Sequence, residues 1–207
     1  MFFSIRTILP LENKMSYPSK ISVDTVWIIP PLRRTGRFCN SPGIWSFGNN
    51  HEKNKDIINK ALKIKPSYIC IVPEKRKEIT TEGGLNLKKN INKIKKIVSK
   101  LKKSKIRTSL FINPSIRDVK KSKEFNVDCV EIHTGKISNL VKLNKTYHNE
   151  LDRIKKSSIL AKNLGIEVHA GHGLDYKTTK ILNKIREIEE FNIGHYIIGE
   201  SVFFGLS

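Results

Sequence analysis

The chain has 207 residues, of which 39 are Lys or Arg and 19 are Asp or Glu, so its formal net charge is +20. Hydrophobic residues make up 38% of the chain, which is enough for one domain with a core and too many for full disorder. No apolar run approaches the roughly 18 residues that crossing a bilayer requires, so we expect no membrane-spanning segment. Cys39, Cys70 and Cys129 form neither a metal-type pair nor a disulfide framework, and the first residues show no signal-peptide pattern. These features favour a reducing cytoplasm.

The positive charge is concentrated between Lys88 and Lys105, where nine lysines and no acidic residue occur. Apolar residues recur there at spacings of three and four, at Leu87, Ile91, Ile94, Ile97, Val98 and Leu101. This pattern predicts an amphipathic helix with lysines on its solvent face. A nucleic-acid surface is the alternative, but lysine outnumbers arginine 30 to 9 and no exposed aromatic residues cluster with it. We therefore expect no nucleic-acid partner.

From about residue 66 the chain alternates strand-like and helix-like segments. Short β-branched runs predict strands over 68–72, 107–112, 128–133, 166–170 and 191–194. Helical periodicity predicts helices over about 87–104, 115–124, 147–164 and 176–187, and a short helix that begins at His195. This order predicts a parallel α/β sheet with helical crossovers, as either an open doubly wound sheet or a closed barrel. No G-x-G-x-x-G follows a strand, so a dinucleotide site is not favoured.

The first fifty residues read differently. Turn-forming or charged pairs interrupt every periodic segment, and only Ile21 to Ile29 has the pattern of a strand. We expect an aberrant or poorly ordered segment over 1–60 and a folded domain over 61–207.

Polar residues and glycines gather where the predicted strands end, which is where parallel α/β proteins hold their sites. Glu131 and His133 are two residues apart and share a face of their strand. Glu131 is either a catalytic carboxylate or a buried acid paired with a lysine. His172, between Gly171 and Gly173, is either a group that transfers protons near neutral pH or a capping histidine in a tight turn.

Gly194 and His195 lie where a predicted strand ends and a predicted helix begins. The free N–H groups at the start of a helix favour the binding of phosphate. The alternative is that the glycine is needed only for packing. Thr80 and Thr81 offer hydroxyls to a phosphate or sugar, or are ordinary loop residues. Histidines at 133, 169, 172 and 195 raise the question of a metal site. They show no H-x-H pattern and no clean same-face pair, so we expect no metal.

Five blocks of sequence, in order and spacing, resemble the pyridoxine 5'-phosphate synthase family over about residues 64–206. The blocks are Ile71–Arg76 with Thr80–Leu85, Ser109–Ile112, Glu131–Gly135, Ala170–Leu174 and Asn192–His195. The resemblance implies a TIM-type (β/α) barrel that is incomplete here, with strands four to eight recognisable and strands one to three and the last helix not. It also implies a transferase of vitamin B6 biosynthesis that uses no cofactor and assembles as a homo-oligomer, an octamer.

That family condenses 3-amino-2-oxopropyl phosphate with 1-deoxy-D-xylulose 5-phosphate to give pyridoxine 5'-phosphate, phosphate and water. By resemblance, His172 matches the proton donor and Glu131 a carboxylate that supports the transition state. Thr80 matches a contact to the deoxyxylulose phosphate. Contacts to the amino-ketone phosphate are matched by Gly173, Gly194 and His195.

The family's N-x-D-H, H-L-R-E-D-R-R-H and N-L-E motifs, two of which carry further catalytic groups, have no match in residues 1–50. We therefore expect this chain to have little or no synthase activity. Two other functions stay open: a non-catalytic basic binding protein on the remaining half-barrel, or another phosphate-binding barrel enzyme.

Overall fold

The computed structural model describes residues 32–33, 44–46, 51–66, 68–73, 83–88 and 91–205, with side chains from residue 58 onward. Thr80, Thr81 and the strand expected over Ile21–Ile29 lie outside these residues, as does most of the segment expected to be poorly ordered. From residue 68 to residue 204 the described chain alternates strands and helices, as the sequence predicts from about residue 66, except that two helices follow each other between residues 135 and 163.

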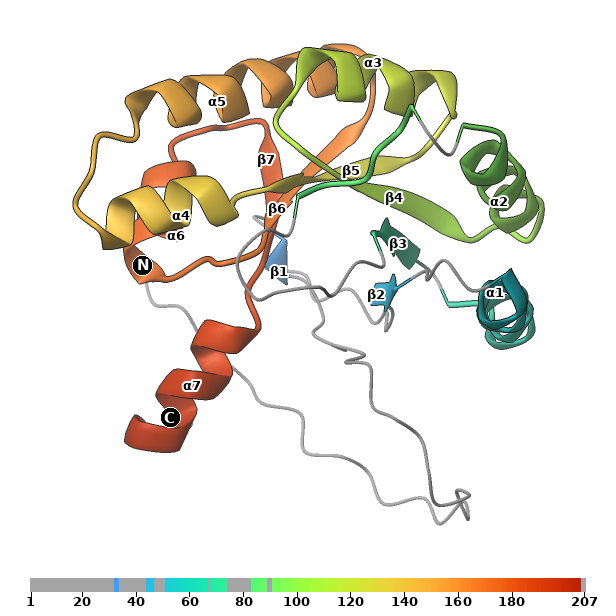
Figure 1. Ribbon diagram of the computed structural model, residues 1–207, viewed down its shortest axis with the longest axis horizontal. Coiled ribbons are helices and arrows are strands. Elements are labelled where there is room, and N and C mark those ends of the chain that lie inside the picture. Colours follow the sequence, from blue (N-terminus) through green and yellow to red (C-terminus); the bar gives the residue numbers. More distant parts are fainter. Residues whose placement is uncertain are drawn as a thin grey trace.

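A seven-stranded sheet forms the centre of the described chain (Figure 1). Its strand order is β1-β7-β6-β5-β4-β3-β2; all neighbours are parallel except β1, which is antiparallel to β7. The strands are β1 (Leu32–Arg33), β2 (Ile44–Ser46), β3 (Tyr68–Val72), β4 (Arg107–Ile112), β5 (Cys129–His133), β6 (Glu167–Gly171) and β7 (Ile188–Asn192). The parallel α/β prediction is confirmed. Because β1 and β2 stand at opposite ends of this order, the described sheet is open and not a closed barrel.

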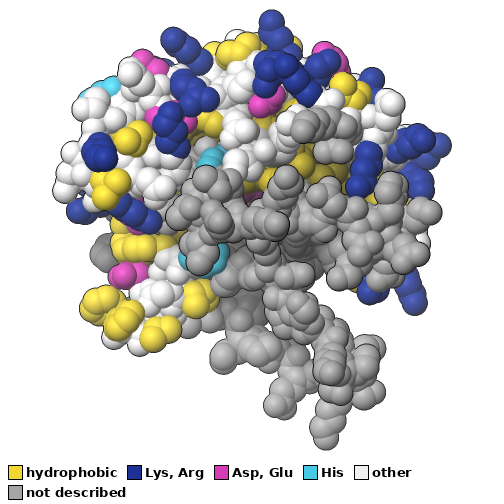
Figure 2. Space-filling view, in the orientation of Figure 1, with side chains coloured by type: hydrophobic (Ala, Val, Ile, Leu, Met, Phe, Trp, Pro, Cys, Tyr) yellow, Lys and Arg dark blue, Asp and Glu magenta, His cyan; other side chains and the backbone are white. Residues whose placement is uncertain are grey.

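Helices connect the parallel strands, and α3, α4 and α5 lie along one side of the sheet (Figure 1). The helices are α1 (His51–Ile64), α2 (Ile91–Lys103), α3 (Ile116–Glu124), α4 (Gly135–Lys142), α5 (His148–Asn163), α6 (Tyr176–Leu182) and α7 (His195–Phe204). The amphipathic prediction for α2 is confirmed, because Ile94, Ile97, Val98 and Leu101 are buried. Figure 2 shows Lys and Arg side chains spread over several helices of the visible face.

The two faces of the sheet carry different chemistry. One face is apolar and joins the helices in a single hydrophobic cluster, to which the strands contribute Ile69, Ile71, Leu110, Ile112, Val130, Ile132, Val168 and Ala170. Alternate residues point the other way and include Cys70, Ser109, Glu131, His169 and Glu190, all of them buried. Buried polar groups need hydrogen-bond partners, so on this second face the side chains of neighbouring strands must form hydrogen bonds or ion pairs with one another.

Several elements differ from the sequence prediction, which does not include α1, β1 or β2. Strand β7 spans Ile188–Asn192 instead of 191–194, because the acidic Glu190 is buried and pairs in register with His169 of β6. Helix α4 begins at Gly135, which reads as a turn in the sequence. Helix α6 ends at Leu182 and not near 187.

Helix α7 extends away from the sheet (Figure 1). It buries none of its residues and exposes large apolar side chains, among them Val202, Phe203 and Phe204. None of the helices that the structure describes is long and apolar enough to cross a membrane.

Candidate functional site at the carboxyl edge of the sheet

The Glu131 carboxyl group is buried on the polar face of β5, with only 5% of the residue exposed. The Cys70 thiol of β3 donates to Glu131 Oε2 at 3.6 Å, and the Asn192 side chain of β7 also hydrogen-bonds this carboxyl group. Burial raises the pKa of Glu131 to about 7, and the charge of His169 is the largest effect in the opposite direction. Among the described residues, the hydrogen-bond partners of Glu131 are therefore a thiol and an amide, not a lysine. A carboxyl group with this pKa can hold or release a proton near neutral pH.

Gly171 makes room for this carboxyl group. A Cβ placed on Gly171 would lie 2.0 Å from Glu131 Oε1 and 3.1 Å from the Asn192 Cβ. Residue 171 must therefore lack a side chain for Glu131 to reach across β6 towards β7.

His172 follows Gly171 with a left-handed backbone, at a φ of 81°, and Gly173 has a φ of 72°. Non-glycine residues rarely adopt this conformation, which costs of order 1 kcal/mol and occurs often at functional sites. The His172 ring lies 4.9 Å from the His133 ring and 6.3 Å from the Phe111 ring, measured between centroids. The turn therefore places the His172 side chain against the ends of β4 and β5.

His133 is the neutral neighbour of His172. Burial, followed by the charge of His172, lowers the pKa of His133 to about 4, against a smaller opposing effect of Glu150. Its Nε2 atom is buried without a hydrogen-bond partner among the described residues. A Cβ on Gly135 would lie 2.9 Å both from this Nε2 atom and from His172 Cδ2. The glycine that begins α4 thus lets both rings lie over the start of the helix.

Gly194 and His195 occupy the junction between β7 and α7. Gly171 pairs with Asn192 in the parallel ladder, so the loops that follow β6 and β7 leave the sheet next to each other. The structure thus places the Glu131 carboxyl group against Gly171, which His172 and Gly173 follow directly, and places Gly194 and His195 at the end of the adjacent strand. Thr80 lies outside the described residues.

Three contributors were missed by the sequence analysis. Cys70 and Asn192 contact Glu131, and Thr134 hydrogen-bonds the turn that carries His172. Asn192 and Thr134 fall inside the blocks of sequence that carry the resemblance, which was a usable signal. Cys70 carried no signal, because only the register across β3, β4 and β5 brings it near Glu131.

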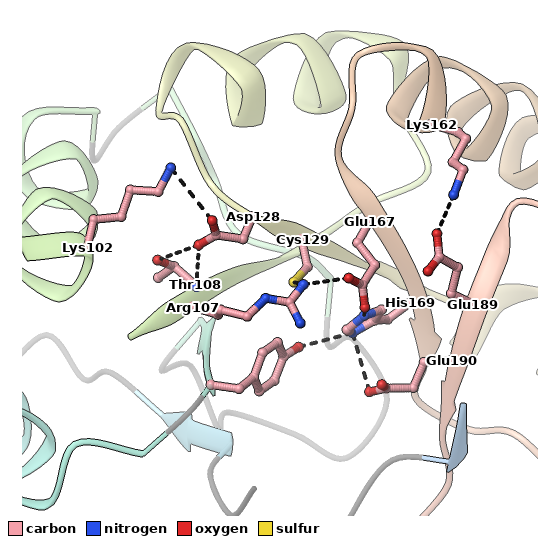
Figure 3. A network of polar contacts seen from close by, with 11 residues as sticks. Lys102, Arg107, Thr108, Asp128, Cys129, Lys162, Glu167, His169, Glu189 and Glu190 are labelled. Carbon is pink, nitrogen blue, oxygen red and sulfur yellow. Dashed lines mark hydrogen bonds and ion pairs between the residues drawn. The ribbon is translucent and has the colours of Figure 1, made fainter. Parts of the chain in front are cut away.

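A second polar network lies on the same face (Figure 3). His169 is 2.9 Å from Glu167 through Nε2, and its Nδ1 lies 3.1 Å from the Tyr68 hydroxyl and 3.4 Å from Glu190. Arg107 donates to Glu167 and to Cys129 Sγ. The hydrogen bond from His169 is the main reason that the pKa of Glu167 is lowered to about 2.

Cys129, Glu167 and His169 hold atoms of metal-ligand type within 4.8 Å of one another. The Arg107 guanidinium contacts two of these three residues and supplies the positive charge that a metal ion would bring. Burial also raises the pKa of the Cys129 thiol well above its usual value, which disfavours the thiolate that a metal requires. The donor set therefore fits a closed ion-pair network better than a metal centre.

Residues 48–207 match the family model described as "Pyridoxal phosphate biosynthesis protein PdxJ". The chain belongs to the PdxJ family. It is 68% identical over 153 residues to a pyridoxine 5'-phosphate synthase of Pelagibacter ubique (strain HTCC1062), an alignment that covers 74% of this chain and 64% of that protein. Identity to the synthase of Campylobacter lari (strain RM2100 / D67 / ATCC BAA-1060) is 43% over 179 residues, covering 76% of this chain and 69% of that protein.

The PdxJ family membership confirms the resemblance carried by the five sequence blocks, and the chain spans about two thirds of the length of these relatives. A solved structure, the PaMucR phosphodiesterase in complex with c-di-GMP, superposes with a TM-score of 0.50 at 13% identity. The superposition covers 72% of this chain and 57% of the phosphodiesterase chain. The likeness is one of fold alone.

Gly171→Ala is expected to destabilise the protein by about 1–3 kcal/mol, because the new methyl group overlaps the Glu131 carboxyl group and overpacks the site. The urea midpoint measures this change. Gly199→Ala is the matched control, since a Cβ there meets no atom within 4 Å and alanine favours helix α7. Equal midpoints for the Gly171→Ala variant and the unchanged protein would contradict the close approach.

The raised pKa of Glu131 predicts a pH-dependent stability. Between pH 4.5 and about 7 the folded protein holds the Glu131 proton that the unfolded chain releases, so Glu131 alone makes the free energy of unfolding fall as pH rises, by about 1.4 kcal/mol per pH unit. The lowered pKa of His133 contributes a change of opposite sign between about pH 4 and pH 6.5, because there the unfolded chain binds the proton that folded His133 lacks. Urea titrations from pH 4.5 to pH 8 should show that Glu131→Gln removes the Glu131 contribution, so that the free energy of unfolding of this variant rises relative to that of the unchanged protein as pH increases to about 7. Glu124→Gln, at an exposed position of α3, should retain this contribution. The same slope in both variants would show that Glu131 does not contribute to it.

Proposed function

We propose that the chain serves the pyridoxine 5'-phosphate synthase reaction, in which 3-amino-2-oxopropyl phosphate and 1-deoxy-D-xylulose 5-phosphate condense to pyridoxine 5'-phosphate, phosphate and water. The observation that carries this proposal is the juxtaposition of Glu131 and the His172 turn across Gly171, in a chain whose relatives bear the name of that synthase. A buried carboxyl group and an imidazole at the same edge of the sheet suit the repeated proton transfers that ring closure and loss of water require.

In this proposal each site residue has a distinct role. His172 donates a proton to the departing oxygen, and the neutral His133 beside it competes for no proton at neutral pH. Glu131 stabilises the charge that develops in the transition state. Gly173, Gly194 and His195 hold the phosphate of the amino ketone, and the position of Gly194 at the start of α7 supports this because helix N–H groups attract anions. Thr80 contacts the deoxyxylulose phosphate.

We also propose that residues 61–207 form part of a TIM-type barrel in which β3 to β7 are strands four to eight, and that the aberrant part lies within residues 1–60, ahead of the family match that begins at residue 48. The open parallel sheet supports this proposal. The motifs absent from residues 1–50 supply two further catalytic groups in the family, so turnover by this chain should be low.

Ligand binding and turnover test the function separately. Isothermal titration is expected to show that the full chain binds pyridoxine 5'-phosphate at least about tenfold more tightly than pyridoxine, because charge-assisted hydrogen bonds to the phosphate are lost with pyridoxine. With both substrates, product formation should be about 100-fold or more below that of the Pelagibacter ubique relative, which is the positive control.

Equal or undetectable binding of the two ligands would contradict the proposed function. Turnover at the rate of the relative would support the synthase assignment and contradict the low activity expected from residues 1–50.

We further propose that the chain works in the cytoplasm as a homo-oligomer, an octamer by its resemblance to the family. The apolar side chains of α7 support assembly, since Val202, Phe203 and Phe204 are 75–82% exposed and exposed apolar patches mark interaction surfaces. Light scattering should give a mass of several 23.7 kDa subunits. Phe203→Ser with Phe204→Ser should lower that mass. A monomer before substitution would contradict assembly.

A further inference from the structure

Thr134 occupies the N-cap position of helix α4, where a threonine ordinarily accepts a hydrogen bond from the first turn of its own helix. Here the side chain makes no such bond. Its hydroxyl instead lies 2.7 Å from the Gly171 carbonyl oxygen and 2.8 Å from the His172 carbonyl oxygen, 37 and 38 residues further along the chain. Thr134 is fully buried, so this arrangement is fixed by packing and not by solvent.

The hydroxyl proton of Thr134 can bond either of these two carbonyl oxygens. The Thr134 backbone N–H already donates to the Gly171 carbonyl at 2.9 Å. A hydroxyl has one proton to give, and the His172 carbonyl is the second acceptor within reach. Thr134 can thus hold two consecutive carbonyl groups of the turn, one with its backbone N–H and one with its side chain.

These two carbonyl groups flank the backbone that is in the rare conformation. His172 has a left-handed φ of 81°, and such a backbone persists only where the surrounding structure holds it in place. Strand register brings Thr134 to this turn. His133 pairs with Gly171 at the ends of β5 and β6, so the next residues of the two strands leave the sheet together.

We propose that Thr134 is a positioning residue whose hydroxyl holds the His172 turn and thereby aims the His172 ring over Gly135. The proposal rests on the proposed function only in taking His172 as the group that faces substrate. The alternative, a threonine that merely fills space at a helix start, predicts that the γ-oxygen is dispensable.

Serine and alanine at position 134 differ only in the hydroxyl, so they form a matched pair. The Cε1–H signal of His172 in ¹³C-histidine-labelled protein, assigned with His172→Asn, reports the environment of the ring. Thr134→Ala should move or broaden this signal and weaken pyridoxine 5'-phosphate binding about tenfold. Thr134→Ser should stay close to the unchanged protein in both measurements.

Thr178→Ala is the control, because Thr178 is also fully buried and its hydroxyl has no hydrogen-bond partner among the described residues. It should leave the His172 signal where it is. Should Thr134→Ala fail to fold, Thr134→Cys keeps the size of the side chain with a weaker donor and should disturb the same signal.

A His172 signal in Thr134→Ala identical to that of the unchanged protein would overturn the proposal, whatever the ligand does. A disturbed signal in Thr134→Ser equal to that in Thr134→Ala would also overturn it. Failure of the unchanged protein to bind pyridoxine 5'-phosphate would overturn the proposed function instead, and the His172 signal would still decide the role of Thr134.

Discussion

The approach of the Glu131 carboxyl group to the backbone of β6 is the constraint on which the rest of the site depends. It requires a glycine at position 171, since any Cβ there would meet the carboxyl oxygen. The same approach buries the acid between Cys70 and Asn192, and this burial raises its pKa. One missing side chain therefore sets the position of the carboxyl group and its readiness to exchange protons.

The polar face of the sheet behaves as one connected layer. Glu131 pairs in register with His169, which in turn contacts Glu167, Glu190 and Tyr68 (Figure 3). The charge of His169 opposes the effect of burial on Glu131, so the ion-pair network also tunes the group at the carboxyl edge. Burying so many polar groups is tolerated because each strand supplies partners to the next, while the opposite face supplies the apolar core.

Small residues at the carboxyl edge hold the histidines in place. Gly135 leaves room for two imidazole rings, and the turn at His172 and Gly173 takes a left-handed path. Of the two rings, His133 has its pKa lowered to about 4 by burial and by the coulombic effect of His172, so the His133 ring is neutral at neutral pH.

The sequence by itself determined the parallel α/β architecture and the family, because strand and helix periodicities are local and the five blocks keep their order and spacing. It also located Glu131 and His172 at strand ends. Only the tertiary structure decided which groups these two residues contact. Strand register, and not sequence distance, brings Cys70 and Asn192 to Glu131. It likewise brings Thr134 to the His172 turn. Packing likewise decided the boundaries of β7 and the existence of α4. Glu190 has a low preference for strands, which its buried contact with His169 overrides. Gly135 has a low preference for helices, but the close approach of His133 and His172 leaves no room for a side chain there.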